Sequence, residues 1–197
     1  MLVPGLSKIQ EIECGANHVL ALDAAGSVFA WGSGQQNQLG RRVVERTRMA
    51  GLTPREFGLP KKKVKIIGVG AYHSFAVDSR DNVWAWGLNS FGECGIADNA
   101  GESEASVAKP TKVASLCGKR LAMIKGGAHH SVAVTEDGNC LVWGRTDSGQ
   151  TGVDLKTLSD EDVRKDDKGS PRILLNPTKI PGMSSLPIGP SFLPARD

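Results

Sequence analysis

The sequence of 197 residues lacks the features that would place it in several common classes of protein. No apolar run approaches the ~18 residues that a membrane-spanning helix needs. The first ten residues show neither the charged region nor the long apolar region of a secretory signal. We therefore expect no membrane partner, and a reducing compartment in which the four cysteines are free thiols.

Motifs of enzymes and metal sites are missing as well. The sequence contains no GxxxxGKS/T, GxSxG or HExxH motif, and its cysteines show neither a CxxC pair nor metal-ligand spacing. Cys14 and Cys140 fall in apolar, strand-like stretches, where we expect small buried side chains. These absences predict a chain that binds no GTP, metal, cofactor or small-molecule substrate, and that is not an enzyme.

Positive charge is concentrated in one segment. Residues 41–65 hold nine Lys or Arg and two Glu, a balance of +7, so the rest of the chain carries −4 of the net charge of +3. Such local basicity indicates one contact patch on an otherwise unremarkable surface.

What the sequence has instead is one pattern in three copies, at residues 12–40, 67–95 and 124–152. Successive copies are offset by 55 and then 57 residues. The shared positions are a glycine (Gly15, Gly70, Gly127), a histidine (His18, His73, His130), a Trp-Gly pair (Trp31–Gly32, Trp86–Gly87, Trp143–Gly144) and a closing glycine (Gly40, Gly95, Gly152). A fixed period of this size predicts a repeat architecture.

Each copy predicts a strand, a tight turn and a second strand; in the first copy these are residues 18–23, 24–27 and 28–31. Polar segments separate the copies, and we expect them to be inserted loops. These segments are residues 41–60, 97–109 and 154–170. We expect the repeat region to cover residues 1–183, and the proline-rich residues 184–197, which lack the pattern, to be a disordered tail.

The glycine, the histidine, the DG-type turn, the Trp-Gly pair and the closing QLG-like element together resemble the regulator of chromosome condensation family. The resemblance covers about residues 3–183. It implies a seven-bladed β-propeller of four-stranded antiparallel blades. Because the chain holds three copies, we expect an all-β partial propeller of about three blades, and a fragment of a longer protein.

One branch of the family is similar in further detail. The string ERTRMAGLTPREFGLPKKK, which follows QLGR, resembles the arginine-bearing insertion of the chromatin-bound guanine nucleotide exchange factor for the small GTPase Ran, above all its fungal form. This resemblance implies a nuclear, chromatin-associated protein that acts on Ran by binding linkage. It also implies that this chain alone lacks full activity, because the blade bearing the wedge that acts on the nucleotide is absent. The alternative is a propeller scaffold without a GTPase partner, for example a domain attached to a ubiquitin ligase.

The in-phase residues favour structural roles. One histidine in each copy, next to a glycine, is what a hydrogen bond between strands requires, whereas a catalytic histidine has no reason to recur three times. We expect His18, His73 and His130 to make such bonds, and Trp31, Trp86 and Trp143 to pack the blades together.

The residue before each repeat histidine varies: Asn17, Tyr72 and His129. Varied polar residues on a rigid rim are how repeat proteins form a binding surface. The resemblance implies Ran contacts at Asn17 and His129, with Tyr72 between them, and at Arg41 of QLGR, although the family commonly has an acid where Asn17 stands. An ordinary polar loop is the alternative for each of them.

Arg46, Arg48 and Arg55 lie in the basic insertion. The resemblance implies that this loop contacts the nucleosome, where arginine pairs with the acidic surface of the histones and DNA is a possible further partner of residues 41–65. Arginine suits this task because its planar fork can pair two carboxylate oxygens. The alternative is a solvated run of charge.

Overall fold

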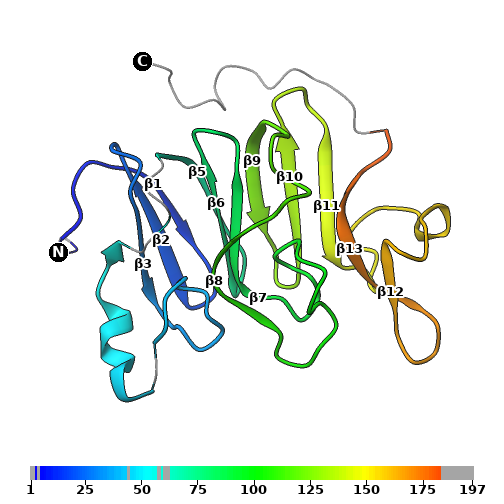
Figure 1. Ribbon diagram of the computed structural model, residues 1–197, viewed down its shortest axis with the longest axis horizontal. Coiled ribbons are helices and arrows are strands. Elements are labelled where there is room, and N and C mark those ends of the chain that lie inside the picture. The colour runs from blue at the N-terminus through cyan, green and yellow to red at the C-terminus, as the bar shows by residue number, and fades with distance from the viewer. Residues whose placement is uncertain (1–2, 4, 44, 57–58, 60–62, 183–197) are drawn as a thin grey trace.

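The computed structural model is a row of three antiparallel β-sheets that stand side by side (Figure 1). It describes residue 3 and residues 5–43, 45–56, 59 and 63–182, with the backbone alone for residues 45–48. The predicted fold class, an all-β partial propeller, is confirmed. The predicted tail, residues 184–197, lies outside the described residues.

Each repeat copy, with the three residues before it, supplies the first three strands of one sheet, and the segment after it supplies the outer part. The first sheet contains β1 (Ile9–Cys14), β2 (His18–Asp23), β3 (Val28–Gly32) and β4 (Arg55–Glu56). The second contains β5 (Val64–Val69), β6 (His73–Asp78), β7 (Val83–Leu88) and β8 (Ser106–Lys112). The third contains β9 (Leu121–Gly126), β10 (His130–Thr135), β11 (Cys140–Arg145), β13 (Pro171–Lys179) and, outermost, β12 (Val163–Lys165). Two short 3-10 helices, η1 (Glu45–Leu52) and η2 (Leu155–Thr157), lie in the segments between strands. In the described parts of the chain, neither helix could span a membrane.

The three inserted segments are not only loops, and this corrects the expectation from the sequence. Each contains strand residues: β4 lies in residues 41–60, β8 begins in residues 97–109, and β12 lies in residues 154–170. Their polar composition hid them, because a strand at the sheet edge buries little apolar surface and shows no clear alternation. Ala100, in the segment expected to be an inserted loop, is fully buried against Ile173 and Leu175.

The aspartate that ends the second strand closes the hairpin turn. Asp78 Oδ1 accepts hydrogen bonds from the backbone N–H groups of Arg80 (2.9 Å) and Asn82 (3.0 Å), and Asp23 does the same in the first sheet. Asp81 adopts a φ of 59°, which Asp tolerates because its short side chain can bond locally. The turn is therefore fixed by the chain's own local chemistry.

The glycines of the repeat pattern make room for close contacts. A Cβ atom on Gly70 would lie 2.1 Å from the ring of His73, so the residue before the loop must be small for the histidine to turn inward. Gly87, which pairs with His73 in the sheet, has a φ of 104°, and a Cβ there would lie 2.5 Å from the carbonyl oxygen of Tyr72. Equivalent contacts occur in the other two copies. The Gly, His and Trp-Gly positions are thus one packing unit.

A chain of hydrogen bonds joins each sheet to the next. His73 Nε2 lies 2.8 Å from Ser131 Oγ, and Ser131 donates in turn to the carbonyl oxygen of Glu93 at 2.8 Å. Trp143 Nε1 donates to the same carbonyl oxygen at 2.8 Å. The same arrangement joins the first and second sheets: His18 bonds to Ser74, and Ser74 and Trp86 both donate to the carbonyl oxygen of Gln38. We call this arrangement the inter-sheet relay.

The relay assigns the charge state of its histidines. The serine hydroxyl donates its proton to a carbonyl oxygen, so toward the histidine it can only accept a hydrogen bond. The histidine Nε2 must therefore be protonated and donate to the serine oxygen. The Nδ1 atoms of His18 and His73 are buried and have no hydrogen-bond partner among the described residues, so a second proton there would be unsolvated. Burial lowers the pKa of His18 to about 4 and that of His73 to about 3. Both rings are therefore neutral at pH 7.

Apolar side chains fill the spaces between the sheets. Leu20, Leu39, Ile67 and Trp86 are fully buried between the first and second sheets. A second cluster, which includes Phe75, Ile124 and Trp143, separates the second sheet from the third. The rings of Phe75 and Trp143 meet edge to face with their centroids 5.9 Å apart.

The innermost strands converge, as the blades of a propeller do around its axis. Lys125 of β9 in the third sheet forms an ion pair with Glu13 of β1, and its Nζ lies 3.9 Å from Glu11 of the same strand. Glu11 also accepts a long hydrogen bond from the backbone N–H of Ile67 in β5 (3.5 Å). Residues of the innermost strands of all three sheets are therefore in contact with one another.

One face of the first sheet is not covered by any other described sheet, whereas both faces of the second sheet are covered. Ile12 is 56% exposed, whereas Ile67 at the equivalent position of the second sheet is 0% exposed. Trp31 is half-buried, whereas Trp86 and Trp143 are fully buried. Cys14 is exposed on this sheet, which corrects the expectation that it is buried. Sequence pattern alone could not reveal this, because burial here depends on a neighbouring sheet.

Replacing Trp143 by Phe removes the indole N–H of the relay and leaves a small void. We expect the free energy of unfolding to fall by about 1–3 kcal/mol. The matched control is Trp31→Phe, at the equivalent but half-buried position, for which we expect a change within about 0.5 kcal/mol. Urea denaturation of both variants tests this, and equal losses would contradict the role assigned to the relay.

The neutral relay histidines predict loss of stability in mild acid. Their folded pKa values lie below the unfolded value of 6.5, so the unfolded chain takes up protons first and stability falls as the pH drops from about 6.5 towards 4. Each histidine contributes up to about 1.4 kcal/mol per pH unit in this window. We expect His73→Gln to flatten the pH dependence more than His130→Gln, at a half-buried position. Burial raises the pKa of Glu11 and Glu93, so these two groups make stability rise as the pH falls. Because both variants keep these groups, the difference in pH dependence between the variants reports the histidines alone.

Candidate functional site on one rim of the sheets

The loops that enter the second strand of each sheet lie together at one end of the molecule. The backbone N–H of Ala16 donates to the carbonyl oxygen of Ala71 (3.0 Å), and that of Ala71 donates to the carbonyl oxygen of Gly127 (2.9 Å). These bonds join residues 15–17, 70–72 and 127–129 into one continuous edge. We call this edge, with the loops that follow the third strands, the repeat rim.

The structure places Asn17, Tyr72 and His129 at equivalent points of the repeat rim. Their carbonyl oxygens accept hydrogen bonds from the residues after the Trp-Gly pairs, at 2.7, 2.9 and 2.8 Å respectively. The side chain of Asn17 is exposed, and those of Tyr72 and His129 are half-buried. The backbone is therefore the same in all three sheets, whereas the side-chain chemistry differs. This is the arrangement that a binding surface on a repeat protein requires.

His129 is held by a buried carboxylate that the sequence reasoning missed. Its Nδ1 lies 3.1 Å from Oε1 of Glu93, whose side chain is 0% exposed, while the histidine is 33% exposed. The other carboxylate oxygen of Glu93 accepts the backbone N–H of Phe91 at 2.8 Å. Burial raises the pKa of Glu93, and the hydrogen bonds from the backbone and from His129 oppose that rise.

A cluster of rings and cations surrounds this pair. The rings of Phe91 and His129 have their centroids 4.9 Å apart. The guanidinium groups of Arg145 and Arg172 lie 4.9 and 5.1 Å from the centroid of Phe91. The sequence held one signal for the cluster: Glu93 stands where the other copies have Gln38 and Gln150, so the acid departs from the pattern.

Arg41, predicted for the same surface, is engaged differently. Its guanidinium donates to the carbonyl oxygens of Ala50 (3.2 Å) and Thr53 (3.5 Å), which ties the start of the inserted segment to its middle. Burial and the nearby charge of Arg55 lower its pKa. The structure therefore brings Asn17, Tyr72 and His129 together and directs the Arg41 head group into the insertion.

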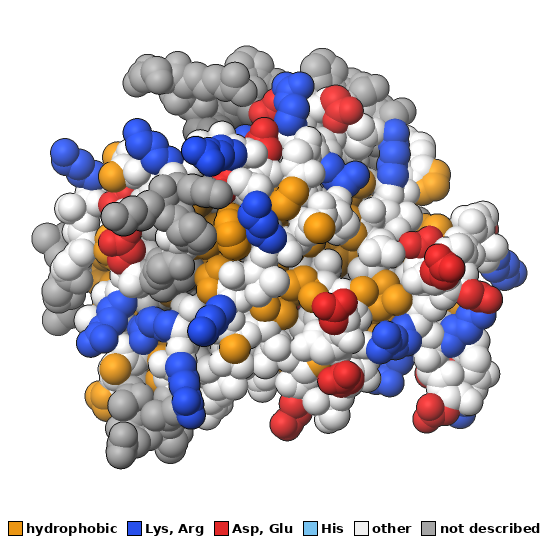
Figure 2. Space-filling view, viewed as in Figure 1, with side chains coloured by type: hydrophobic (Ala, Val, Ile, Leu, Met, Phe, Trp, Pro, Cys, Tyr) orange, Lys and Arg blue, Asp and Glu red, His pale blue; other side chains and the backbone are white. Residues whose placement is uncertain are grey.

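The basic insertion projects from the first sheet. Arg46 and Arg48 lie on η1, where the structure describes only the backbone, and Arg55 lies exposed on β4. Met49 (71% exposed) and Leu52 (57%) present apolar surface on the same helix. Figure 2 shows Lys and Arg side chains grouped on the side of the molecule where η1 lies. The insertion thus offers cations and apolar groups to a partner.

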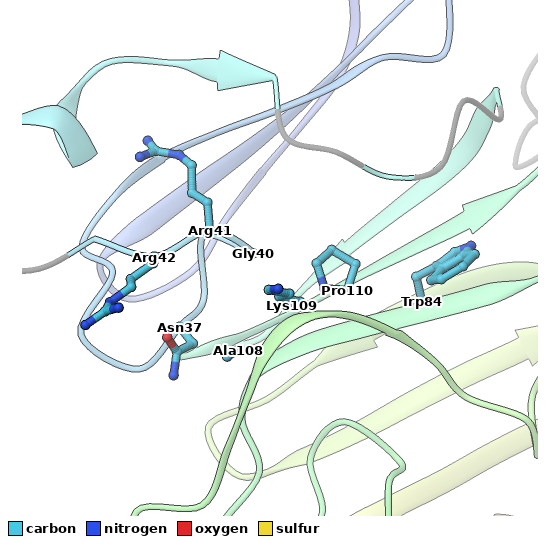
Figure 3. A pocket seen from close by; sticks show the side chains of 8 residues that line it. All are labelled: Asn37, Gly40, Arg41, Arg42, Trp84, Ala108, Lys109 and Pro110. Carbon is cyan, nitrogen blue, oxygen red and sulfur yellow. The ribbon is translucent and has the colours of Figure 1, made fainter.

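A cavity of about 660 Å³ lies between the base of this insertion and the second sheet. Arg41 and Arg42 border it on one side, and Lys109, Pro110 and Trp84 on the other (Figure 3). Lys112 lies 5.6 Å from the ring centroid of Trp84. The lining carries three cations and no acid, so it suits an anionic group.

In the part of the chain that the structure describes, no three His, Cys, Asp or Glu side chains are grouped so that they could hold a metal ion. The histidines of the relay bond to serines and are buried between the sheets.

Comparison with known proteins identifies relatives along almost the whole chain. Residues 1–188 match the RCC1-like domain family. The chain is 45% identical over 181 residues to protein pim1 of Schizosaccharomyces pombe, an alignment that covers 92% of this chain and 33% of that protein. It is 42% identical over 180 residues to the guanine nucleotide exchange factor SRM1 of Saccharomyces cerevisiae, which covers 90% of this chain and 36% of that protein.

A solved structure agrees with these relatives. The crystal structure of Prp20p from Saccharomyces cerevisiae, a protein studied for its binding properties to Gsp1p and histones, superimposes with a TM-score of 0.83 at 40% identity. The superposition covers 91% of this chain and 41% of that chain. The chain spans about a third of the length of the two curated relatives. By its repeats, its three sheets and these matches, the chain belongs to the RCC1-like domain family.

Proposed function

We propose that this chain belongs to a guanine nucleotide exchange factor for the small GTPase Ran, and that the repeat rim forms part of its GTPase-binding surface. The observation that carries the proposal is the 42% identity to an exchange factor over 90% of the chain. The rim supports it, because Asn17, Tyr72 and His129 stand side by side with different side chains on an identical backbone.

The proposed mechanism is linkage and involves no covalent chemistry. A rim that binds the nucleotide-free GTPase more tightly than the nucleotide-bound form must lower the affinity of the GTPase for nucleotide by the same factor. The relay makes the rim suitable for this, because a rigid surface can favour one conformation of its partner. The proposal needs no metal and no catalytic residue.

We further propose that the basic insertion binds the acidic surface of the nucleosome through Arg46, Arg48 and Arg55, with DNA as a possible additional contact of residues 41–65. The balance of +7 in this segment and the exposed Arg55, Met49 and Leu52 support this. Such binding would keep the protein in the nucleus, on chromatin, and would produce GTP-bound Ran there.

Binding to Ran tests the rim. We expect the chain to bind nucleotide-free Ran more tightly than GDP-bound Ran, and His129→Ala to weaken the first interaction at least about tenfold, or 1.4 kcal/mol. Lys119→Ala is the matched control, because Lys119 is exposed in the loop before β9, at the opposite end of the sheets. Isothermal calorimetry measures both. Equal affinity for the two states of Ran, or no binding at all, would favour a scaffold with another partner.

Binding to nucleosomes tests the insertion. We expect Arg55→Glu, combined with the same change at Arg46 and Arg48, to weaken binding at least about tenfold and to reduce its dependence on salt, because fewer cations then take part. Lys168→Glu makes the same change of charge at one site, in the exposed turn between β12 and β13 of the third sheet, and should have little effect. Gel-shift titration at several salt concentrations measures this; an equal loss in the control would show only general charge attraction.

A further inference from the structure

We propose that Glu93 is a positioning residue that fixes the tautomer of His129: Nδ1–H is donated to the buried carboxylate, and Nε2 is presented at the repeat rim as the acceptor for a neutral hydrogen-bond donor of the GTPase. The inference deepens the proposed function and rests on it for the identity of the partner. The tautomer itself is a property of this chain and can be tested without the partner.

Comparison of the three repeat copies shows which hydrogen bond is common to this position and which is made by Glu93 alone. The equivalent residues are Gln38 and Gln150, and each accepts the backbone N–H two residues before it: Gln36 to Gln38 Oε1 at 2.8 Å, and Ser148 to Gln150 Oε1 at 2.9 Å. Glu93 makes the same bond with one oxygen, Oε2, at 2.8 Å. A glutamine is therefore sufficient to close this loop. The carboxylate is required for something else.

What the carboxylate adds is a second acceptor, and it is used on His129. Oε1 of Glu93 lies 3.1 Å from Nδ1 of the ring. With Glu93 ionised, its carboxylate only accepts hydrogen bonds, so the proton between these atoms belongs to Nδ1. In the neutral ring the other nitrogen, Nε2, is then an acceptor. The hydrogen bond made by Nδ1 thus determines that Nε2 is a hydrogen-bond acceptor.

The surroundings keep the ring in this orientation. Phe91 packs against the imidazole at 4.9 Å, and the cations of Arg145 and Arg172 lie over Phe91. Arg145 is itself paired with Asp147 at 2.7 Å. One third of the His129 side chain is exposed, and Nε2 makes no hydrogen bond to any described residue. The two nearby arginines disfavour a cationic donor, so the geometry fits an amide N–H or a hydroxyl of the partner.

The burial of Glu93 supports a specific role. Its side chain is 0% exposed, and removing a carboxylate from water is unfavourable unless it is paired. Glutamine at this position would avoid that cost and would keep the loop bond, as the first and third copies do. Glu93 is followed in the next copy by a rim histidine, His129, whereas Gln38 is followed in the next copy by Tyr72.

The substitution Glu93→Gln tests the inference because it reverses the tautomer without removing the loop bond. The single amide oxygen takes the Phe91 N–H, as in the sister copies, so the amide NH₂ faces His129 and Nδ1 must become the acceptor. Two-dimensional NMR of the ¹⁵N-labelled imidazole rings should show Nδ1–H in the unchanged chain and Nε2–H in the variant. His129→Ala assigns the signals, and Gln150→Glu, which adds an acid at the equivalent position of the third copy, should leave them unchanged. The same tautomer in both proteins would overturn the proposal.

Binding separates this inference from the proposed function. If the unchanged chain binds nucleotide-free Ran, Glu93→Gln should weaken binding at least fivefold without lowering the melting temperature, and should add nothing in a His129→Ala background. A full additional loss in that background, or unchanged affinity of the single variant, would overturn the inference and leave the function standing. If the unchanged chain does not bind Ran, the proposed function fails, and the NMR result alone decides the role of Glu93.

Discussion

The fold depends on one recurring interaction, the hydrogen-bond relay that joins a neutral histidine of one sheet to a serine and a tryptophan of the next. His73 bonds to Ser131, and Ser131 and Trp143 both donate to the carbonyl oxygen of Glu93, in fully buried space. Sheets that touched only through apolar side chains could slide, because dispersion contacts have little direction. The relay has direction, and so it fixes how each sheet sits against its neighbour.

The relay also connects the core to the surface. The carbonyl oxygen that accepts from Ser131 and Trp143 belongs to Glu93, and the side chain of the same residue holds His129 on the rim. Structural and binding features thus share one residue, with the backbone serving the fold and the carboxylate serving the rim. A surface supported in this way changes shape little, which suits the preferential binding to one state of a GTPase that we propose.

The two ends of the row differ from its middle. The first copy has Val19 where the others have Ser74 and Ser131, and its Trp31 and Ile12 are only partly covered. At the other end, His130 is half-buried and has no serine partner among the described residues. Among the described residues, only the second sheet is packed between two other sheets. The same repeat sequence therefore has different energetics in the three copies, because each blade derives stability from its neighbours.

The sequence by itself determined the period, the strand–turn–strand hairpin of each copy and the shared positions of Gly, His and Trp, because these follow from local chemistry and spacing. It also placed Asn17, Tyr72 and His129 at equivalent points of the repeat. It did not reveal the edge strands β4 and β12, the exposure of Cys14 or the pairing of Glu93 with His129. Those features join residues that are distant in sequence, or depend on whether a neighbouring sheet covers them, and only the tertiary structure decides which surfaces meet.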